Sequence, residues 1–215
     1  MRVSELVART GVPLATVKYY LREGLLMPGE ATSATQARYG EKHVERLGLV
    51  KALAGAGLPI PRIREILRLV DHPDGSLFEV LGEAIAQLPP YLDASDTGGG
   101  GDADEFPRAR AVLDRLGQVY DPGYVAVGQL ERALEGLEEA GIPMTEERLE
   151  AYGRHVRGIA EIDIGLMPTE SAEDAIRYAV LGTAIYEPVI AAMRRLAHQD
   201  VAQKRLRKPE EQDQQ

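Results

Sequence analysis

The chain has 215 residues, of which 44% are hydrophobic, and it contains neither Cys nor Trp. This composition allows a sizeable aliphatic core in one or two domains, and it excludes disulfide bonds and thiolate metal sites. The net charge of −9 is split into +5 on residues 1–70 and −14 on residues 71–215. A basic first segment can attract DNA while the acidic remainder would repel it. Chance surface charge is the alternative explanation of this split.

Several classes of function find no support in the sequence. No stretch reaches the roughly 18 apolar residues of a membrane helix, and the N-terminus lacks the apolar run of a signal peptide. The chain has no GxSxG, HExxH or phosphate-loop motif, and its four His are scattered. We therefore expect a cytoplasmic, nucleoid-associated protein that is not an enzyme, with no membrane partner, no cofactor, no metal site and no catalytic residues.

The first two predicted helices form a helix-turn-helix pattern. Ser4 is the predicted N-cap of the first helix, and Gly11 ends it. Pro13 suits the start of the second helix, and Gly24 suits its end. Apolar residues spaced by three and four share one face of the second helix, namely Leu14, Val17 and Leu21. Its other faces offer side chains that suit phosphates and base edges, namely Lys18, Tyr19 and Arg22.

Residues 27–39 (MPGEATSATQARY) follow as a predicted wing. Pro28, Gly29 and a run of small polar residues exclude a helix and favour a hairpin that returns to Arg38 and Tyr39. Arg38 suits a DNA contact. Tyr39 suits either a DNA contact or packing under the wing. Further helices are predicted over residues 43–54, 61–70 and 76–88, and Pro89 and Pro90 close the last of these.

The run Thr-Val-Lys-Tyr-Tyr at 16–20, followed by Gly24-Leu25-Leu26, resembles the recognition helix of MerR-type bacterial transcription regulators. Residues 4–12, 43–53 and 58–67 resemble other helices of the same family. The resemblance implies a winged helix-turn-helix that binds double-stranded DNA, a homodimer on a pseudo-palindromic operator, and RNA polymerase as a partner at the promoter. It implies DNA contacts by Ser4, Thr16, Lys18, Tyr19, Tyr20, Arg22, Arg38 and Tyr39. Activation by promoter distortion and simple repression both remain open.

In that family a long helix after the fourth pairs two subunits, but here Pro89 and Pro90 shorten it. The dimer contact is therefore open between the helix at 76–88 and the C-terminal domain, where residues 181–196 offer a long apolar face. Part of this face, residues 181–193, resembles weakly the effector domain of TetR-type regulators. Gly182 and Pro188 are expected to bend or split the last helix.

The predicted fold class is all-α, with an N-terminal winged helix-turn-helix domain and a C-terminal helical bundle. The expected parts are a DNA-binding domain over 1–72, a short connecting helix within 73–92, a Gly/Asp-rich linker over 93–104, an effector and dimerisation domain over 105–208, and a disordered tail over 209–215.

The acidic domain is the candidate site for a small organic effector. Amphipathic side chains that could line a pocket are Tyr152, His155, Tyr178 and Tyr186, and ordinary core packing is the alternative for each. Glu161 or Asp163, if either reaches the pocket, would favour a neutral or cationic ligand. The resulting hypothesis is a ligand-responsive regulator. The alternative hypothesis is a non-sensing architectural DNA-binding protein whose helical domain serves dimerisation or protein–protein contact.

Overall fold

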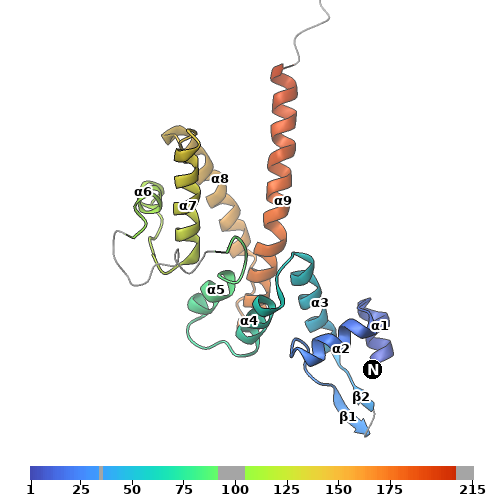
Figure 1. Cartoon of the computed structure of the whole chain (residues 1–215). Helices are drawn as coiled ribbons and strands as arrows, with labels where there is room; N and C mark the ends of the chain where they lie inside the picture. Colours follow the sequence, from blue (N-terminus) through green and yellow to red (C-terminus); the bar gives the residue numbers. More distant parts are fainter. Residues whose placement is uncertain (34–35, 92–104, 207–215) are drawn as a thin grey trace, which may run out of the picture.

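The computed structural model describes residues 1–33, 36–91 and 105–206 (Figure 1). Over these ranges the fold is helical apart from one two-stranded sheet, which confirms the predicted fold class. The elements in chain order are α1 (Val3–Thr10), α2 (Leu14–Arg22), β1 (Glu30–Ser33), β2 (Gln36–Arg38), α3 (Glu41–Gly55), α4 (Ile60–Asp71), α5 (Leu77–Ile85), α6 (Pro107–Leu116), α7 (Val125–Glu139), α8 (Glu146–Gly165) and α9 (Ala172–Leu206). The predicted linker over 93–104 and the predicted tail over 209–215 lie outside the described residues.

Helices α1 to α4 close around one aliphatic core. Each helix contributes at least one fully buried side chain, namely Leu6, Val17, Leu47 and Ile63. Burying one such side chain stabilises the fold by roughly 1.5–3 kcal/mol. Gly11 has a φ of 66°, which lets the chain leave α1 in the left-handed region and enter α2 after a tight turn. The core and the turn together fix the direction of α2.

The wing forms as the sequence predicts. Strands β1 and β2 are antiparallel, with Glu30 opposite Arg38. Close approach of the chain requires Gly29, because a Cβ at this position would lie 2.7 Å from the carbonyl oxygen of Arg38. Met1 and Tyr39 exchange two backbone hydrogen bonds, of 2.7 Å and 2.9 Å, which tie the base of the wing to the start of the chain.

Helix α5 and the first turns of α9 belong to the same core as the N-terminal helices. Val80 and Ala84 of α5 and Ile176 and Val180 of α9 are fully buried in it. At the edge of this contact, Arg177 of α9 forms an ion pair of 3.5 Å with Glu45 of α3. The predicted linker therefore separates two stretches of sequence that share one core.

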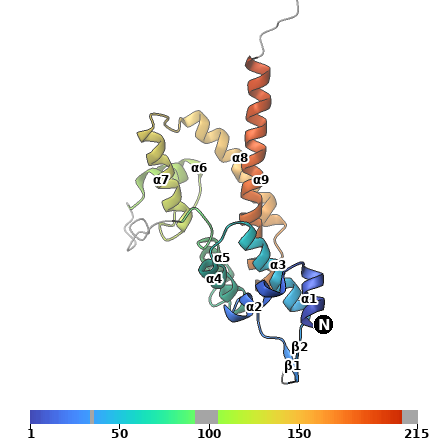
Figure 2. The same ribbon diagram turned by 45° about the vertical axis from the view of Figure 1, so that its right-hand side comes forward.

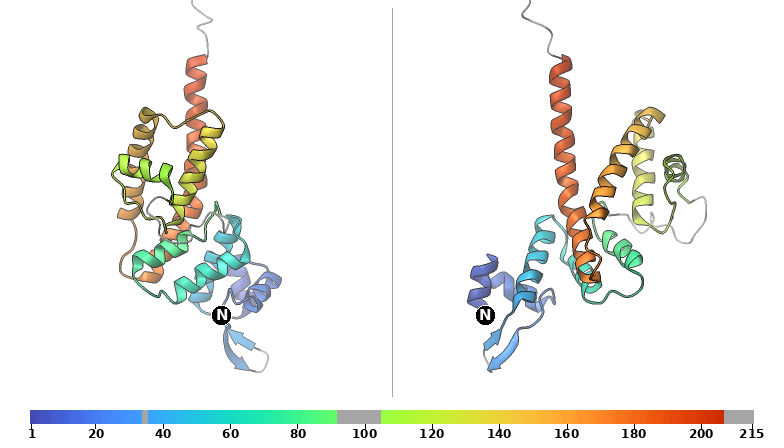
Figure 3. Two further views of the ribbon diagram at one scale, coloured as in Figure 1. Left: turned by 60° about the vertical axis from the view of Figure 1, so that its left-hand side comes forward. Right: turned by 180° about the vertical axis from the view of Figure 1, so that it is seen from behind.

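Helices α6, α7 and α8 form a smaller unit beside this core. Phe106, Ala109 and Val127 make up its buried cluster. Arg108 of α6 donates to Glu131 and Glu138 of α7, and these two hydrogen bonds raise the pKa of the guanidinium. None of the residues of α8 is buried, and Figure 3 shows this helix leaning away from α9 above their common base.

Gly182 and Pro188 are expected from the sequence to bend or split the last helix. Helix α9 is continuous over 35 residues, so the prediction of a split is wrong, and a bend stays a prediction. A proline inside a helix removes one backbone donor, and here the helix loses that hydrogen bond without ending. From Ile185 onward nearly all its side chains are exposed, and Figure 1 shows this part projecting beyond the other helices. Among the described residues, no helix combines the length and apolar character that a membrane crossing needs.

The predicted N-cap of α1 is also wrong by two residues. The helix begins at Val3, so Ser4 lies inside the first turn, where its side chain is exposed. Glu5 takes over the capping, because its Oε2 accepts a hydrogen bond of 2.9 Å from the backbone N–H of Arg2. A carboxylate in the first turn also suits the positive end of the helix dipole.

Helix α5 begins with a capping box, which makes Ser76 a test of its stability. Ser76 Oγ accepts from the N–H of Glu79, and the Glu79 carboxylate accepts from the N–H of Ser76 at 2.9 Å. The backbone N–H of Ser76 and its hydroxyl, at 2.8 Å, both donate to the Glu79 carboxylate, and these two bonds lower its pKa. We expect Ser76→Ala to lower the free energy of unfolding by about 1 kcal/mol, the usual effect of a lost N-cap. Melting temperatures of the two proteins would measure it.

The same variant should change the titration of the helix start. Because the pKa of Glu79 is lowered in the folded chain, this contribution to stability is present above the ordinary glutamate pKa and is lost as the pH falls through the folded value. Ser76→Ala removes the hydroxyl donor and keeps the backbone N–H, so the pKa of Glu79 should move part of the way back toward its ordinary value, as followed by NMR. An unchanged Glu79 titration would show that the serine hydroxyl is not its partner in solution.

Candidate nucleic-acid interface and ligand cavity

The exposed side of α2 carries two cations one helical turn apart. Lys18 and Arg22 are both exposed, and Lys18 has no hydrogen bond or ion pair to another described residue. The Arg22 guanidinium lies 5.3 Å from the centre of the half-buried Tyr19 ring, a cation–π distance. The ring supports Arg22 on one side, and the Arg22 Nε lies 3.8 Å from Glu23 Oε1, a long ion pair at an exposed position that a DNA phosphate could replace. Two cations placed in this way suit phosphates and guanine edges.

One of the predicted DNA contacts on α2 is buried. Tyr20 is only 8% exposed and packs in the core, so its side chain does not face a partner. It lies three residues after Val17, and the two side chains share the buried face of α2. Thr16 is half-buried and Ser4 is exposed, so both remain accessible at the edge of the helix-turn-helix.

The wing presents Arg38 and packs Tyr39. Arg38 is exposed on β2, whereas Tyr39 is half-buried and meets His43 edge to face, with 5.1 Å between the ring centres. His43 in turn caps α3, because its Nδ1 accepts a 3.0 Å hydrogen bond from the N–H of Gly40. Figure 2 shows the wing and α2 at the same end of the molecule. Arg38 can therefore reach the same partner as α2.

Other exposed cations of this unit were not singled out by the sequence, namely Arg2, Lys42 and Lys51. Lys51 lies beside the turn between α1 and α2, where its Nζ is 3.8 Å from the position of a Cβ on Gly11. Arg9 is paired with Glu41. Only the positive charge of the whole segment pointed to these residues.

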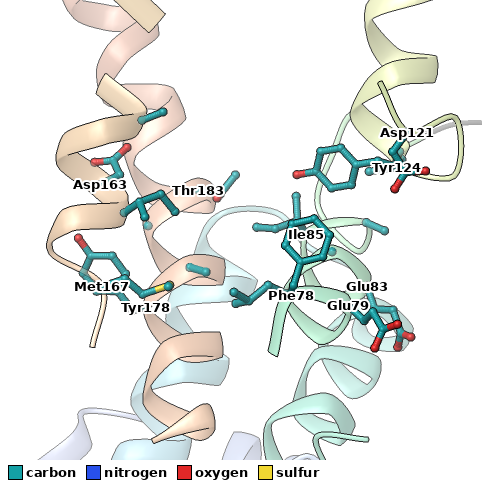
Figure 4. A pocket seen from close by; sticks show the side chains of 18 of the residues that line it. Phe78, Glu79, Glu83, Ile85, Asp121, Tyr124, Asp163, Met167, Tyr178 and Thr183 are labelled. Atoms are coloured by element: carbon teal, nitrogen blue, oxygen red, sulfur yellow. The ribbon is translucent and has the colours of Figure 1, made fainter. Parts of the chain in front are cut away.

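A second candidate site is a largely apolar cavity of about 900 Å³ (Figure 4). Its walls come from α5, the start of α7, the end of α8 and the first half of α9. A volume of this size falls in the range of small-molecule sites. Among the described residues, no group of three or more His, Cys, Asp or Glu could hold a metal ion. The largely apolar walls are typical of sites for small organic molecules.

The structure brings two of the four candidate ligand residues to this cavity. Tyr178 and Tyr186 of α9 line it, together with Tyr124. Tyr152 and His155 lie farther back along α8, are exposed, and are not among its lining residues. They were chosen as amphipathic side chains of the acidic domain, but this part of α8 is exposed in the structure.

Of the two acidic residues that the sequence analysis named as possible ligand contacts, only one lines the cavity. Asp163 lines the cavity, and Glu161 does not; the latter instead accepts from Arg157 at 3.0 Å. Glu187 of α9 also lines the cavity, and partial burial raises the pKa of its carboxyl. Burial likewise raises the pKa of Tyr124. Sequence analysis missed Glu187 and the whole contribution of α5, including Phe78, because nothing local shows which helices meet.

The comparisons with known proteins agree with the interface on α2 and the wing. Residues 1–69 match the sequence profile of the MerR HTH family of regulatory proteins. The mercuric resistance operon regulatory protein of Pseudomonas fluorescens is 38% identical over 61 residues, which cover 28% of this chain and 42% of that protein. The corresponding protein of Bacillus cereus is 32% identical over 87 residues, which cover 40% of this chain and 66% of that protein. The chain thus spans less than two thirds of the length of these relatives.

One solved structure matches nearly the whole chain. A proposed transcriptional regulator from Streptomyces coelicolor A3(2) is 30% identical and superposes with a TM-score of 0.64, covering 96% of this chain and 98% of that one. The similarity to regulators therefore extends beyond the DNA-binding unit. With its matched helix-turn-helix, its wing and these relatives, the chain belongs to the MerR-type transcriptional regulators.

Proposed function

We propose that this regulator is ligand-responsive, that it binds a pseudo-palindromic operator as a homodimer, and that its effector occupies the cavity. One observation carries the proposal. Two of the helices that wall the cavity, α5 and α9, also supply buried residues to the core of the DNA-binding unit. A ligand in the cavity would therefore touch the same helices that hold α2 in place.

Helix α5 connects the cavity directly to the DNA-binding unit. On α5, Val80 and Ala84 are buried against the DNA-binding unit, while Leu81 and Ile85, one residue later in each case, line the cavity. A ligand that binds one position of α5 better than another shifts the protein toward that position. Since α5 packs directly on α4, the shift would reach the DNA-binding unit through packed side chains and not through the predicted linker.

Helix α9 is the element that we propose to join two copies. Beyond the shared core it exposes an apolar stripe with spacings of three and four residues, and each member is 45–64% exposed: Ile185, Val189, Met193 and Leu196. A stripe of this kind on a long helix is typical of a helix that pairs with another. A two-fold axis across the stripe would produce a dimer that matches a two-fold operator.

The test is a screen for small molecules that raise the melting temperature, followed by operator binding and transcription with RNA polymerase in vitro. A ligand at 100 times its Kd should add about 2.7 kcal/mol to stability. The expected result is a ligand that stabilises the protein and also changes its operator affinity or the transcript level. A rise in transcript would indicate activation, and a fall would indicate repression.

The alternative is an architectural protein that senses nothing. Under that alternative, molecules that stabilise the protein would leave both operator affinity and transcript level unchanged. Such an outcome would contradict the proposal, because an effector must bind the two functional states with different affinities.

A further inference from the structure

The charged residues that line the cavity are all of one sign. Among the described residues, five carboxylates and no Lys, Arg or His line it. Three of the five already have partners: Glu79 accepts from Ser76, Glu83 lies 3.7 Å from Arg68, and Asp121 accepts from the N–H of Gly123. The two remaining carboxylates belong to Asp163 and Glu187.

These two carboxylates have no hydrogen bond or ion pair to another described residue. They come from different helices, Asp163 from α8 and Glu187 from α9. Figure 4 shows Asp163 at the edge of the cavity opposite Glu79 and Glu83, so it is well separated from the partnered acids. Partial burial without a partner disfavours the ionised form of Glu187, and it raises the pKa of this carboxyl. A positive charge nearby would remove this unfavourable effect.

Aromatic rings make up a further part of the wall. Phe78, Tyr124, Tyr178 and Tyr186 line the cavity from α5, the start of α7 and α9. Phe78 is 81% exposed, an unusual state for a phenylalanine, and Figure 4 shows its ring reaching up from α5 toward the cavity. The faces of aromatic rings attract cations, and quaternary ammonium groups are bound in this way.

We propose that the cavity selects apolar organic cations, with an aryl or alkyl body against the aliphatic wall and an ammonium group near Asp163 and Glu187. This inference rests on the proposed function and names the chemical class of its effector. A cation is favoured over a neutral molecule because it supplies the missing partner of two carboxylates, and an anion is rejected by five acids of one sign.

The experiment compares three probes of similar size that differ in charge. They are (4-phenylbutyl)trimethylammonium, its neutral isostere with carbon in place of the quaternary nitrogen, and 4-phenylbutylsulfonate. Binding of each to the full chain is measured by calorimetry and by thermal shift. We expect the cation to bind at least about tenfold more tightly than the neutral isostere, and the sulfonate not to bind detectably.

Matched variants separate a local effect from the overall charge of the protein. Asp163→Asn and Glu187→Gln should each weaken binding of the cation by about three- to tenfold and leave the neutral isostere unaffected. Glu161→Gln on α8 and Asp200→Asn on α9 remove the same charge from the same helices, at exposed positions outside the cavity. These controls should bind the cation as the unchanged protein does.

Different outcomes contradict this inference and the proposed function. Equal binding of the cation and the neutral isostere, both weakened by Gly182→Leu in the cavity wall, would overturn charge selection while leaving a ligand-binding cavity. Equal losses in the controls and in the cavity variants would also overturn it, since the effect would then come from net charge. Binding of the cation without any change in operator affinity or transcript level would support charge selection but contradict the ligand-responsive function. No binding of the cation would overturn the inference.

Discussion

Replacing Lys18 and Arg22 together by alanine should reduce operator affinity by at least roughly a hundredfold, since one base contact is usually worth about 1–3 kcal/mol. Both side chains are exposed on the same side of α2, and the fold holds that helix through the fully buried Val17. If Lys18 contacts a phosphate, its loss should also flatten the salt dependence of binding by about one unit of slope. Titration of a labelled operator at several salt concentrations measures both effects.

The control for this double variant removes the same charge elsewhere. Arg154→Ala with Arg157→Ala lowers the net charge equally, on exposed positions of α8. It should bind the operator nearly as the unchanged protein does, apart from a small long-range effect of charge. If the α2 variant keeps its melting temperature and still binds like this control, then α2 is not the helix that contacts DNA.

Replacing Val189 and Leu196 together by serine should convert the dimer into a monomer at micromolar concentration. The two side chains are 45% and 64% exposed in the single chain, so the substitution costs the isolated fold little. In a two-fold dimer four apolar side chains would lose their contacts, and we expect dimer affinity to fall by at least about a hundredfold. Sedimentation or light scattering over a range of concentrations would measure this.

The opposite face of α9 supplies the control. Arg194 and His198 are exposed on that face, one helical turn apart, and their double serine variant should remain a dimer. A Val189 and Leu196 variant that stays dimeric would move the contact elsewhere, and the short helix α5 is the other candidate. Loss of the dimer should also weaken binding to a two-fold operator more than to a single half-site.

The parts of the fold that local sequence determines were predicted well. The positions of α2 and the wing follow from Gly11, Pro13, Gly24 and Gly29, whose backbone preferences act within a few residues. The apolar spacing of α3 and α4 was equally local. The error at Tyr20 shows the limit of a resemblance. The resemblance implied a DNA contact for this residue, whereas its side chain is 8% exposed and packs in the core.

The cavity could not have been predicted, because its walls are far apart in the sequence. Phe78 and Glu187 line the same space although more than a hundred residues separate them. Tyr178 and Tyr152 look alike as members of helical stripes, but one faces the cavity and the other faces solvent. Only the angle between α8 and α9 decides between them, and no short-range pattern encodes that angle.

The continuity of α9 has a consequence for the DNA sites that such a dimer can use. Val180 is buried in the core of the DNA-binding unit and Leu196 belongs to the proposed pairing stripe, and the continuous helix places about 24 Å of helical rise between them. The helix then sets the distance between the two DNA-binding units of the dimer. If an operator has an added half-turn of DNA between its half-sites, the second half-site faces the opposite side of the duplex, where the second DNA-binding unit cannot reach it. Adaptation to another spacing would require shifting the crossing point of the two helices by whole heptads, because smaller shifts would rotate the stripe away from its partner.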